Sequence, residues 1–134
     1  MTEDDLLRAV LDLARILGLR TAHFRAAQLK DRDGEARWVT AVQGDGKGYP
    51  DLTIVGPGGV LFRELKSERG IVAPEQKAWL DDLAAGGADA GVWRPADLRS
   101  GRISTELRAL RSSASRAQPA RNLTAGRNRP AWMK

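Results

Sequence analysis

Cysteine is absent from this 134-residue sequence, and histidine occurs once, as His23. The absence of cysteine excludes disulfides, a thiol nucleophile and thiolate zinc sites, and a single histidine excludes zinc sites built from several imidazoles. No apolar run approaches the ~20 residues of a membrane-spanning helix, and the N-terminal residues Thr2 to Asp5 are too acidic for a signal peptide. We therefore expect a soluble, cytoplasmic protein that has no membrane partner.

Acidic and basic residues are unevenly distributed along the chain. Residues 1–98 contain 13 lysines and arginines against 16 acidic residues, whereas residues 99–134 contain 9 against one. The net charge of +5 therefore arises from the C-terminal part. A basic tail favours polyanions through counterion release, although it can also serve only for solubility. From residue 112 onward small and polar residues dominate, so we expect residues 112–134 to form a disordered tail.

Two short runs rich in β-branched and aliphatic residues flank the turn Gly56-Pro57-Gly58-Gly59, which predicts a β-hairpin over residues 48–66. Side chains alternate between the two faces of a strand, so Glu64 and Lys66 share one face of the second strand. Asp51 lies at the start of the first strand, and the hairpin folds it back beside Glu64. We therefore expect two carboxylates and one ammonium group to converge on one side of a sheet.

Two carboxylates a few ångströms apart repel each other unless a cation lies between them. Oxygen ligands of this kind suit Mg²⁺ or Mn²⁺, which bind through one or two carboxylates and keep waters for substrate phosphates. Lys66, two residues beyond Glu64, could orient an attacking water or offset developing charge. These residue types indicate metal-assisted hydrolysis of phosphodiesters.

The order Pro50-Asp51 followed by Glu64-x-Lys66 resembles the PD-(D/E)xK nuclease superfamily. With the further motifs Gly48-Tyr49, Pro74-Glu75-Gln76 and Val92-Trp93-Arg94-Pro95, the chain resembles more narrowly the VRR-Nuc branch, the virus-type replication and repair nucleases. The resemblance covers most of the chain, as far as Asp97. It implies an α/β fold with a small central mixed sheet flanked by helices. It also implies Mg²⁺ as the cofactor, with Mn²⁺ as a substitute, and no nucleotide cofactor.

The resemblance assigns catalytic roles to several residues of this chain. Asp51, Glu64 and the backbone carbonyl of Leu65 would hold the metal, and Lys66 would position or activate water. Gln76 lies on the apolar stripe of a helix that we predict from Pro74 to about Ala85, with Leu80 and Leu83 on its buried face. An amide in that position needs a partner. Gln76 either bonds a strand end or, as the resemblance implies, lies at the edge of the metal site.

A first helix is predicted to begin at Thr2, the N-cap residue, and to end at Gly18. In the resembled family this helix carries an acidic residue that joins the metal site. Glu3 is the best match by position, with Asp4 and Asp5 as rivals. The alternative is that these acids only cap the helix and complement its dipole.

Three further residues are candidates for contacts with DNA: Lys47, Arg94 and His23. His23, on a strand predicted over residues 19–25, can instead be a packing or hydrogen-bonding residue. Arg94 either contacts a phosphate or pairs with Asp97. Lys47 ends a long polar connection over residues 26–48, in which Trp38 to Val42 form a short strand or a flap.

These features divide the chain into three parts: a VRR-Nuc nuclease core over residues 1–98, a short helical extension over residues 99–111 and the basic tail over residues 112–134. The apolar stripe of the extension consists of Ile103, Leu107 and Leu110. Such a stripe needs a surface to cover it, which is either the core or a second subunit.

The expected function follows from the resemblance and the length. Short VRR-Nuc proteins resemble dimeric junction resolvases, so we expect an endonuclease that acts as a homodimer on four-way (Holliday) DNA junctions. One alternative is a nuclease selective for flaps or single strands, or a nonspecific one. The other is an inactive DNA-binding module whose affinity comes from the tail.

Overall fold

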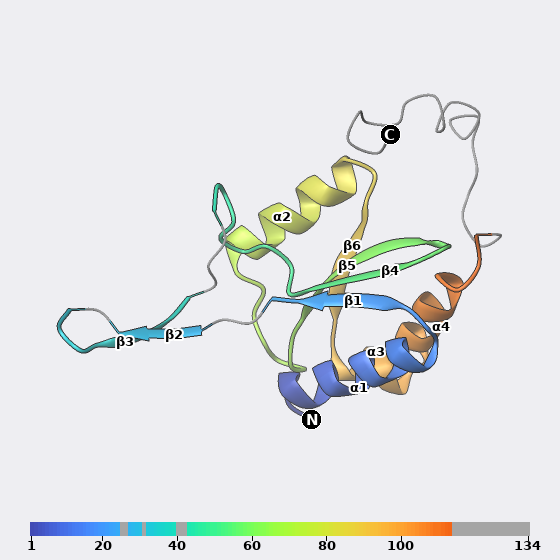
Figure 1. Ribbon diagram of the computed structural model, residues 1–134, viewed down its shortest axis with the longest axis horizontal. Helices are drawn as coiled ribbons and strands as arrows, with labels where there is room; N and C mark the ends of the chain where they lie inside the picture. The colour runs from blue at the N-terminus through green and yellow to red at the C-terminus, as the bar shows by residue number, and fades with distance from the viewer. Residues whose placement is uncertain (25–26, 31, 40–42, 114–134) are drawn as a thin grey trace.

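The structure is a computed structural model, and it describes residues 1–24, 27–30, 32–39 and 43–113. Its centre is a four-stranded sheet in the order β1-β4-β5-β6 (Figure 1). Neighbouring strands are antiparallel except for β6, which runs parallel to β5. The strands span Arg20–His23 (β1), Leu52–Gly56 (β4), Gly59–Leu65 (β5) and Asp89–Trp93 (β6). The predicted α/β fold with a small mixed sheet is confirmed.

Helix α1 (Glu3–Ile16) begins as its sequence predicts. The Thr2 hydroxyl accepts a hydrogen bond from the Asp5 backbone N–H, and the Asp5 carboxylate accepts one from the Thr2 N–H. This capping box satisfies two N–H groups that would otherwise lack partners in the first turn. The chain leaves the helix through Gly18, whose φ of +73° is a left-handed conformation that glycine adopts without steric cost.

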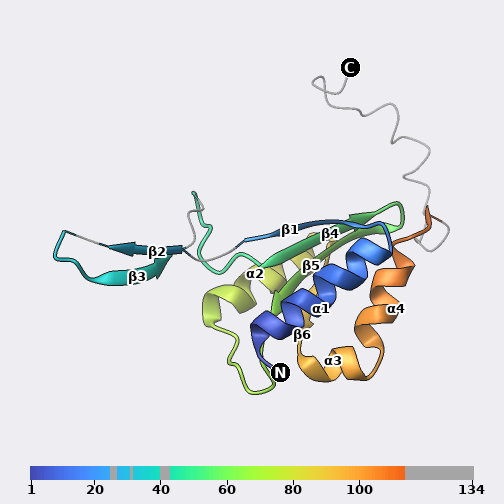
Figure 2. The same ribbon diagram turned by 60° about the horizontal axis from the view of Figure 1, so that its bottom comes forward.

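Three helices cover one face of the sheet: α1, α3 (Pro95–Arg99) and α4 (Arg102–Ala109) (Figure 2). Their apolar side chains and those of the facing strands form the core, which consists of Leu6, Leu7, Val10, Ala14, Leu19, Leu52, Ile54, Leu61, Leu65, Trp93, Ile103, Leu107 and Leu110. The stripe near the C-terminal end of the described chain is therefore covered by the core. Within the described ranges, no helix is long and apolar enough to cross a membrane.

The hairpin β4–β5 packs closely against the end of α4. Gly56 pairs with Gly59, so Pro57 and Gly58 form the turn. The Gly58 N–H donates to the Leu110 carbonyl at 2.9 Å, and a Cβ built on Gly56 would lie 2.3 Å from the same carbonyl oxygen. A side chain at Gly56 would therefore force the two segments apart, and the glycines of this turn allow two backbones to approach each other.

A buried arginine lies on the core face of β5. The guanidinium Nη2 of Arg63 donates to Asp89 Oδ1 at 2.8 Å and to Glu106 Oε1 at 3.2 Å. The other carboxylate oxygen of Glu106 accepts a hydrogen bond from Trp93 Nε1 at 3.0 Å, and the guanidinium carbon lies 5.0 Å from the centroid of the Trp93 ring. This network joins α4 to two neighbouring strands of the sheet.

Helix α2 (Pro74–Ala85) lies on the opposite face and has the predicted bounds. Its Gln76 bonds Glu64 of β5, whereas Glu106 of α4 bonds the adjacent Arg63, and adjacent strand residues point to opposite faces. Leu80 and Leu83 are only half-buried, so the expected buried face of this helix forms only in part. The physical reason is that α2 packs on the edge strand β6, beyond which the sheet has no further strand to cover it.

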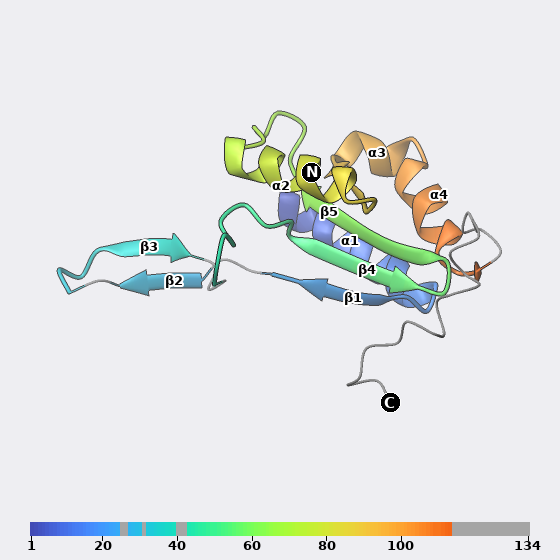
Figure 3. The same cartoon turned by 90° about the horizontal axis from the view of Figure 1, so that it is seen from above.

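Between β1 and β4 the chain forms a separate two-stranded antiparallel sheet, β2 (Ala27–Lys30) and β3 (Ala36–Val39). It extends away from the four-stranded sheet in two perpendicular views (Figure 1, Figure 3). The strand expected near Trp38 is therefore confirmed as far as Val39. Residues 40–42 and the tail from residue 114 lie outside the described residues.

Candidate active site

The register of the hairpin brings Asp51 and Glu64 together. Leu52 pairs with Arg63, so Asp51 and Glu64 are the next opposed positions, and opposed residues of antiparallel strands have their side chains on the same face. The Asp51 carboxylate, Oδ2, accepts a hydrogen bond from the Leu65 backbone N–H at 3.0 Å. This bond fixes the first carboxylate across the strand that carries the second. The predicted alternation of β5 is thereby confirmed, with Leu61 and Leu65 in the core and Glu64 on the other face.

Glu64 is buried in an environment that compensates its charge only in part. Its side chain is 3% exposed, Oε1 accepts a hydrogen bond from Gln76 Nε2 at 2.8 Å, and Lys66 Nζ lies 3.8 Å from the same oxygen. The other oxygen, Oε2, is buried and has no hydrogen-bond partner among the described residues. Burial first, and then the nearby Asp51, raise the pKa of Glu64 to about 8, against the opposing effect of Lys66.

Gln76 links the carboxylate of Glu64 to the start of α2. Its Oε1 accepts a hydrogen bond from the Ala73 backbone N–H at 2.9 Å, which leaves the Nε2 amino group to donate to Glu64. Both ends of the amide are therefore in use and its orientation follows from the hydrogen bonds. Gln76 therefore contacts Glu64, which with Asp51 forms the acidic cluster of this site.

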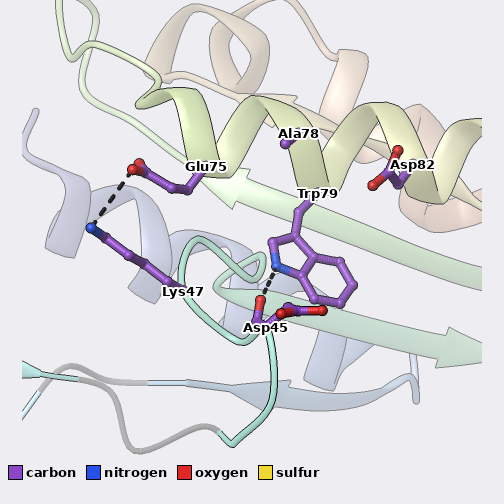
Figure 4. Close-up of a pocket in the computed structure, with 6 residues that line it drawn as sticks. All are labelled: Asp45, Lys47, Glu75, Ala78, Trp79 and Asp82. Carbon is purple, nitrogen blue, oxygen red and sulfur yellow. Dashed lines mark hydrogen bonds and ion pairs between the residues drawn. The ribbon is translucent and has the colours of Figure 1, made fainter.

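The segment before Asp51 packs directly on the start of α2. Gly48 has a φ of +87°, and a Cβ built on it would lie 2.5 Å from the backbone carbon of Glu75. Lys47 forms an ion pair with Glu75 at 3.6 Å (Figure 4). Gly48 is three residues from Asp51, and Glu75 precedes Gln76. The contact between Gly48 and Glu75 therefore determines how close the start of α2 lies to the hairpin.

A cavity of about 380 Å³ lies beside this contact (Figure 4). It is lined by Asp45, Lys47, Glu75, Ala78, Trp79 and Asp82. The Trp79 indole N–H donates to the Asp45 carbonyl at 2.9 Å, which joins α2 to the segment before β4. Three carboxylates and one lysine make this cavity unsuited to a phosphate, and none of the residues of the acidic cluster lines it. The cavity is therefore distinct from the candidate active site.

In the described contacts, no hydrogen bond or ion pair joins an acid at the start of α1 to Asp51 or Glu64. Glu3 is exposed at the start of α1, and Asp5 is engaged with Thr2. Among the described residues, no three acidic or histidine side chains form a group that could hold a metal. In this structure Asp5 serves the capping role, and the participation of Glu3 at the metal stays a prediction.

None of the three candidate DNA contacts bonds Asp51, Glu64 or Gln76 in the described contacts. His23 pairs with Leu52, which faces the core, so the imidazole lies on the face opposite to Asp51. Lys47 is exposed and paired with Glu75. The Arg94 guanidinium does not pair with Asp97, whose carboxylate accepts instead from the Arg94 backbone N–H at 2.8 Å. The guanidinium donates to backbone carbonyls of the loop after Lys66, and its contact with a phosphate stays a prediction.

The donor set at the cluster suits a hard divalent cation. Asp51 and Glu64 offer carboxylate oxygens from one face of two paired strands, and the buried, unpartnered Oε2 of Glu64 is an acceptor that a cation would satisfy. With the predicted carbonyl ligand of Leu65, the set would be all-oxygen, which is what Mg²⁺ and Mn²⁺ prefer. The residues present therefore fit the metal that the sequence implies.

Comparison with known proteins agrees with this chemistry. Neither the curated proteins nor the solved structures gave a match to the chain. The model of the VRR-NUC domain family matches residues 16–97, which is more than half of the chain and includes Asp51, Glu64, Lys66 and Gln76. The chain therefore belongs to the VRR-NUC family, nuclease domains of the PD-(D/E)xK fold.

Proposed function

We propose that this nuclease domain is a Mg²⁺-dependent endonuclease that hydrolyses phosphodiester bonds in branched DNA, and that it acts on four-way junctions as a homodimer. The observation that carries the metal dependence is the Oε2 atom of Glu64, a buried acceptor without a partner among the described residues, next to a second carboxylate. The raised pKa shows that the ionised form is poorly stabilised in the metal-free protein, and a divalent cation would stabilise that form in the working enzyme.

Each residue of the cluster has a role that follows from its contacts. Asp51 and Glu64 would hold the metal, together with the Leu65 carbonyl. When bound, the metal would polarise the scissile phosphate and lower the pKa of a coordinated water. Gln76 restrains the Glu64 carboxylate through Nε2, and the Lys66 ammonium, 3.8 Å from Glu64 Oε1, is placed to orient water or to offset negative charge at the phosphate.

The selectivity for four-way junctions rests on symmetry and on the family. A four-way junction has an approximate two-fold axis, and an isologous dimer would present two identical sites to two opposed strands. One candidate site per protomer gives two per dimer. Light scattering should therefore find a dimer at micromolar concentration. A monomer that cuts junctions and linear duplex equally would contradict this part of the proposal.

The deciding experiment measures cleavage of labelled four-way junction, flap, single-stranded and linear duplex DNA, with and without Mg²⁺. Wild type is compared with Asp51→Ala and with Asp81→Ala, which removes an exposed acid of α2 that pairs only with Lys77 in the described contacts. We expect Mg²⁺-dependent cutting by wild type and Asp81→Ala but not by Asp51→Ala. Preferred cutting of flaps or single strands would replace the junction assignment with that of a flap or single-strand nuclease. Metal-independent cutting would overturn the proposed chemistry.

A further inference from the structure

The loop of residues 67–73 is attached to the candidate active site at both ends. It begins after Lys66, whose ammonium lies 3.8 Å from Glu64 Oε1. It ends at Ala73, whose backbone N–H donates to Gln76 Oε1, and the Nε2 of the same amide donates to Glu64 Oε1. Both ends of the loop therefore meet at one carboxylate, and whatever approaches that carboxylate also approaches the loop.

Arg94 holds the middle of this loop. Its Nη1 donates to the carbonyls of Ser67 at 2.7 Å, Gly70 at 2.8 Å and Glu68 at 3.2 Å. A turn bond from the Gly70 N–H to the Ser67 carbonyl, at 3.2 Å, closes the same segment. Charge-assisted hydrogen bonds to several carbonyls fix the backbone in one conformation. The loop is therefore preorganised before any substrate binds.

This fixed loop exposes a large apolar side chain. Ile71 is 85% exposed, the highest value for any large apolar residue in the described part of the chain. Single exposed apolar residues are common on protein surfaces and need no special explanation. Ile71, however, lies on a braced loop, five residues from Lys66 and five from Gln76, with the exposed Arg69 nearby. Five residues span at most about 18 Å, so Ile71 lies within about five base-pair steps of a phosphodiester at the cluster.

We propose that the loop is a preformed DNA-contact element, in which Ile71 packs against a base step within about five steps of the cleaved bond and Arg94 acts as the positioning residue. The inference rests on the proposed function. Isoleucine is among the apolar side chains that proteins insert between base steps, which unstacks and kinks the duplex. Unstacking is cheapest where bases are already unpaired or weakly stacked. The partner is therefore DNA with an opened step, such as the branch point of a junction.

The test uses a four-way junction with 2-aminopurine at the branch point, whose fluorescence rises when the base unstacks. Binding is measured in EDTA, so that the DNA stays intact. Ile71→Ala is compared with Ile16→Ala, a matched change of an isoleucine that is 76% exposed at the end of α1. We expect wild type and Ile16→Ala to raise the fluorescence. Ile71→Ala should abolish the rise and weaken binding by about tenfold. Equal fluorescence and affinity for the three proteins would overturn the contact.

Two variants of Arg94 distinguish a phosphate contact from a positioning role: Arg94→Gln removes the charge, and Arg94→Lys keeps the charge but not the planar guanidinium. A phosphate contact predicts that Arg94→Gln lowers the slope of log K against log salt by about 0.9 and that Arg94→Lys restores binding. A positioning role predicts an unchanged slope in both variants, loss of the 2-aminopurine signal and no rescue by lysine, since an ammonium lacks the guanidinium's planar set of donors. The first pattern would overturn the assignment of Arg94.

The two levels of the inference fail separately. Wild type that cuts DNA with Mg²⁺ but shows no difference between Ile71→Ala and Ile16→Ala contradicts only the loop contact. Wild type that neither binds nor cuts any of the DNA structures contradicts the proposed function, and the loop contact with it. Thermal unfolding of each variant gives the folded fraction, and Ile71→Ala changes only an exposed side chain.

Discussion

Arg63 and Glu64 are neighbours on β5, both are 2% exposed, and their side chains point to opposite faces of the sheet. Arg63 lies on the core face, where two carboxylates, two backbone carbonyls and an aromatic ring surround its guanidinium. Glu64 lies on the other face, where a neutral amide is its only hydrogen-bond donor among the described residues, the Lys66 ammonium lies 3.8 Å away and an acidic neighbour repels it. The fold surrounds the first buried charge with partners and compensates the second only in part.

This contrast separates a structural charge from a functional one. Only Nε of the Arg63 guanidinium lacks a partner within the described ranges, whereas Glu64 lacks one on a carboxylate oxygen that carries half of its charge. A buried ion network of the first kind holds elements together. A buried acid of the second kind, with its pKa raised to about 8, is the type of group that active sites contain. The comparison is tested by removing each charge in turn.

The largest effect is expected on catalysis when the charge of Glu64 is removed. Glu64→Gln should lower the rate of Mg²⁺-dependent DNA cleavage by about 10³-fold or more, because one metal ligand is lost. The same change should leave the metal-free protein at least as stable as wild type, because it replaces a poorly solvated acid by a neutral amide. Single-turnover cleavage and urea unfolding in EDTA measure the two quantities. A variant that is unstable but fully active would invert the comparison.

Removal of the Arg63 charge should instead lower stability and leave catalysis intact. Arg63→Met should lower the free energy of unfolding by about 1 to 3 kcal/mol, because it removes the donor to the carbonyls of Phe62 and Asp89 and one of the two cations beside Glu106. Arg108→Met, which changes an exposed arginine of α4, is the matched control and should have little effect. Denaturant titration of the three proteins measures the difference. Cleavage by the folded fraction of Arg63→Met should persist.

The raised pKa predicts how stability depends on pH. A carboxyl group whose pKa is higher in the folded protein stabilises the fold below its unfolded value and loses that contribution as pH rises through the folded value. For Glu64 the window runs from 4.5 to about 8. Metal-free wild type should therefore lose on the order of a few kcal/mol across this window relative to Glu64→Gln. Saturating Mg²⁺ should restore the loss at pH 8, since the cation binds the ionised form. Parallel pH curves for the two proteins in EDTA would contradict the assignment.

Much of the site could be predicted because its signals are local. The Gly/Pro turn determines the hairpin, and the hairpin's two-residue period then places Asp51 opposite Glu64 and puts Lys66 on the same face. The Thr2 capping box likewise marks the start of α1, and Pro74 and Gly86 mark the start and the end of α2. Sequence patterns of this range describe which residues share a face of one element.

Contacts between distant elements could not be predicted in the same way. The guanidinium of Arg94 reaches carbonyls 24 to 27 residues away, so its role depends on how β6 lies beside β5. The face of His23 depends on the register of β1 against β4. The Arg63 network could have been predicted in part, because a charged residue between Leu61 and Leu65 on an apolar face requires an opposite charge nearby.

The smallest effect is expected from a change that shifts the helix carrying Gln76 relative to Glu64. Gly48→Ala places a Cβ within 2.6 Å of two backbone atoms of Glu75, the residue before Gln76, and so shifts the amide that donates to Glu64. Gly44→Ala is the matched control, because Gly44 has a similar φ, +73° against +87°, but nothing within 4 Å of its Cβ. Both variants carry the strain of a left-handed alanine, about 1 kcal/mol, and only Gly48→Ala carries the clash. We expect Gly48→Ala to be the less stable by a further 1 to 2 kcal/mol or so and to cleave DNA more slowly at saturating substrate. Equal stability and equal cleavage in the two variants would show that the segment before Asp51 does not set the position of α2, and that Glu64 is held by the sheet alone.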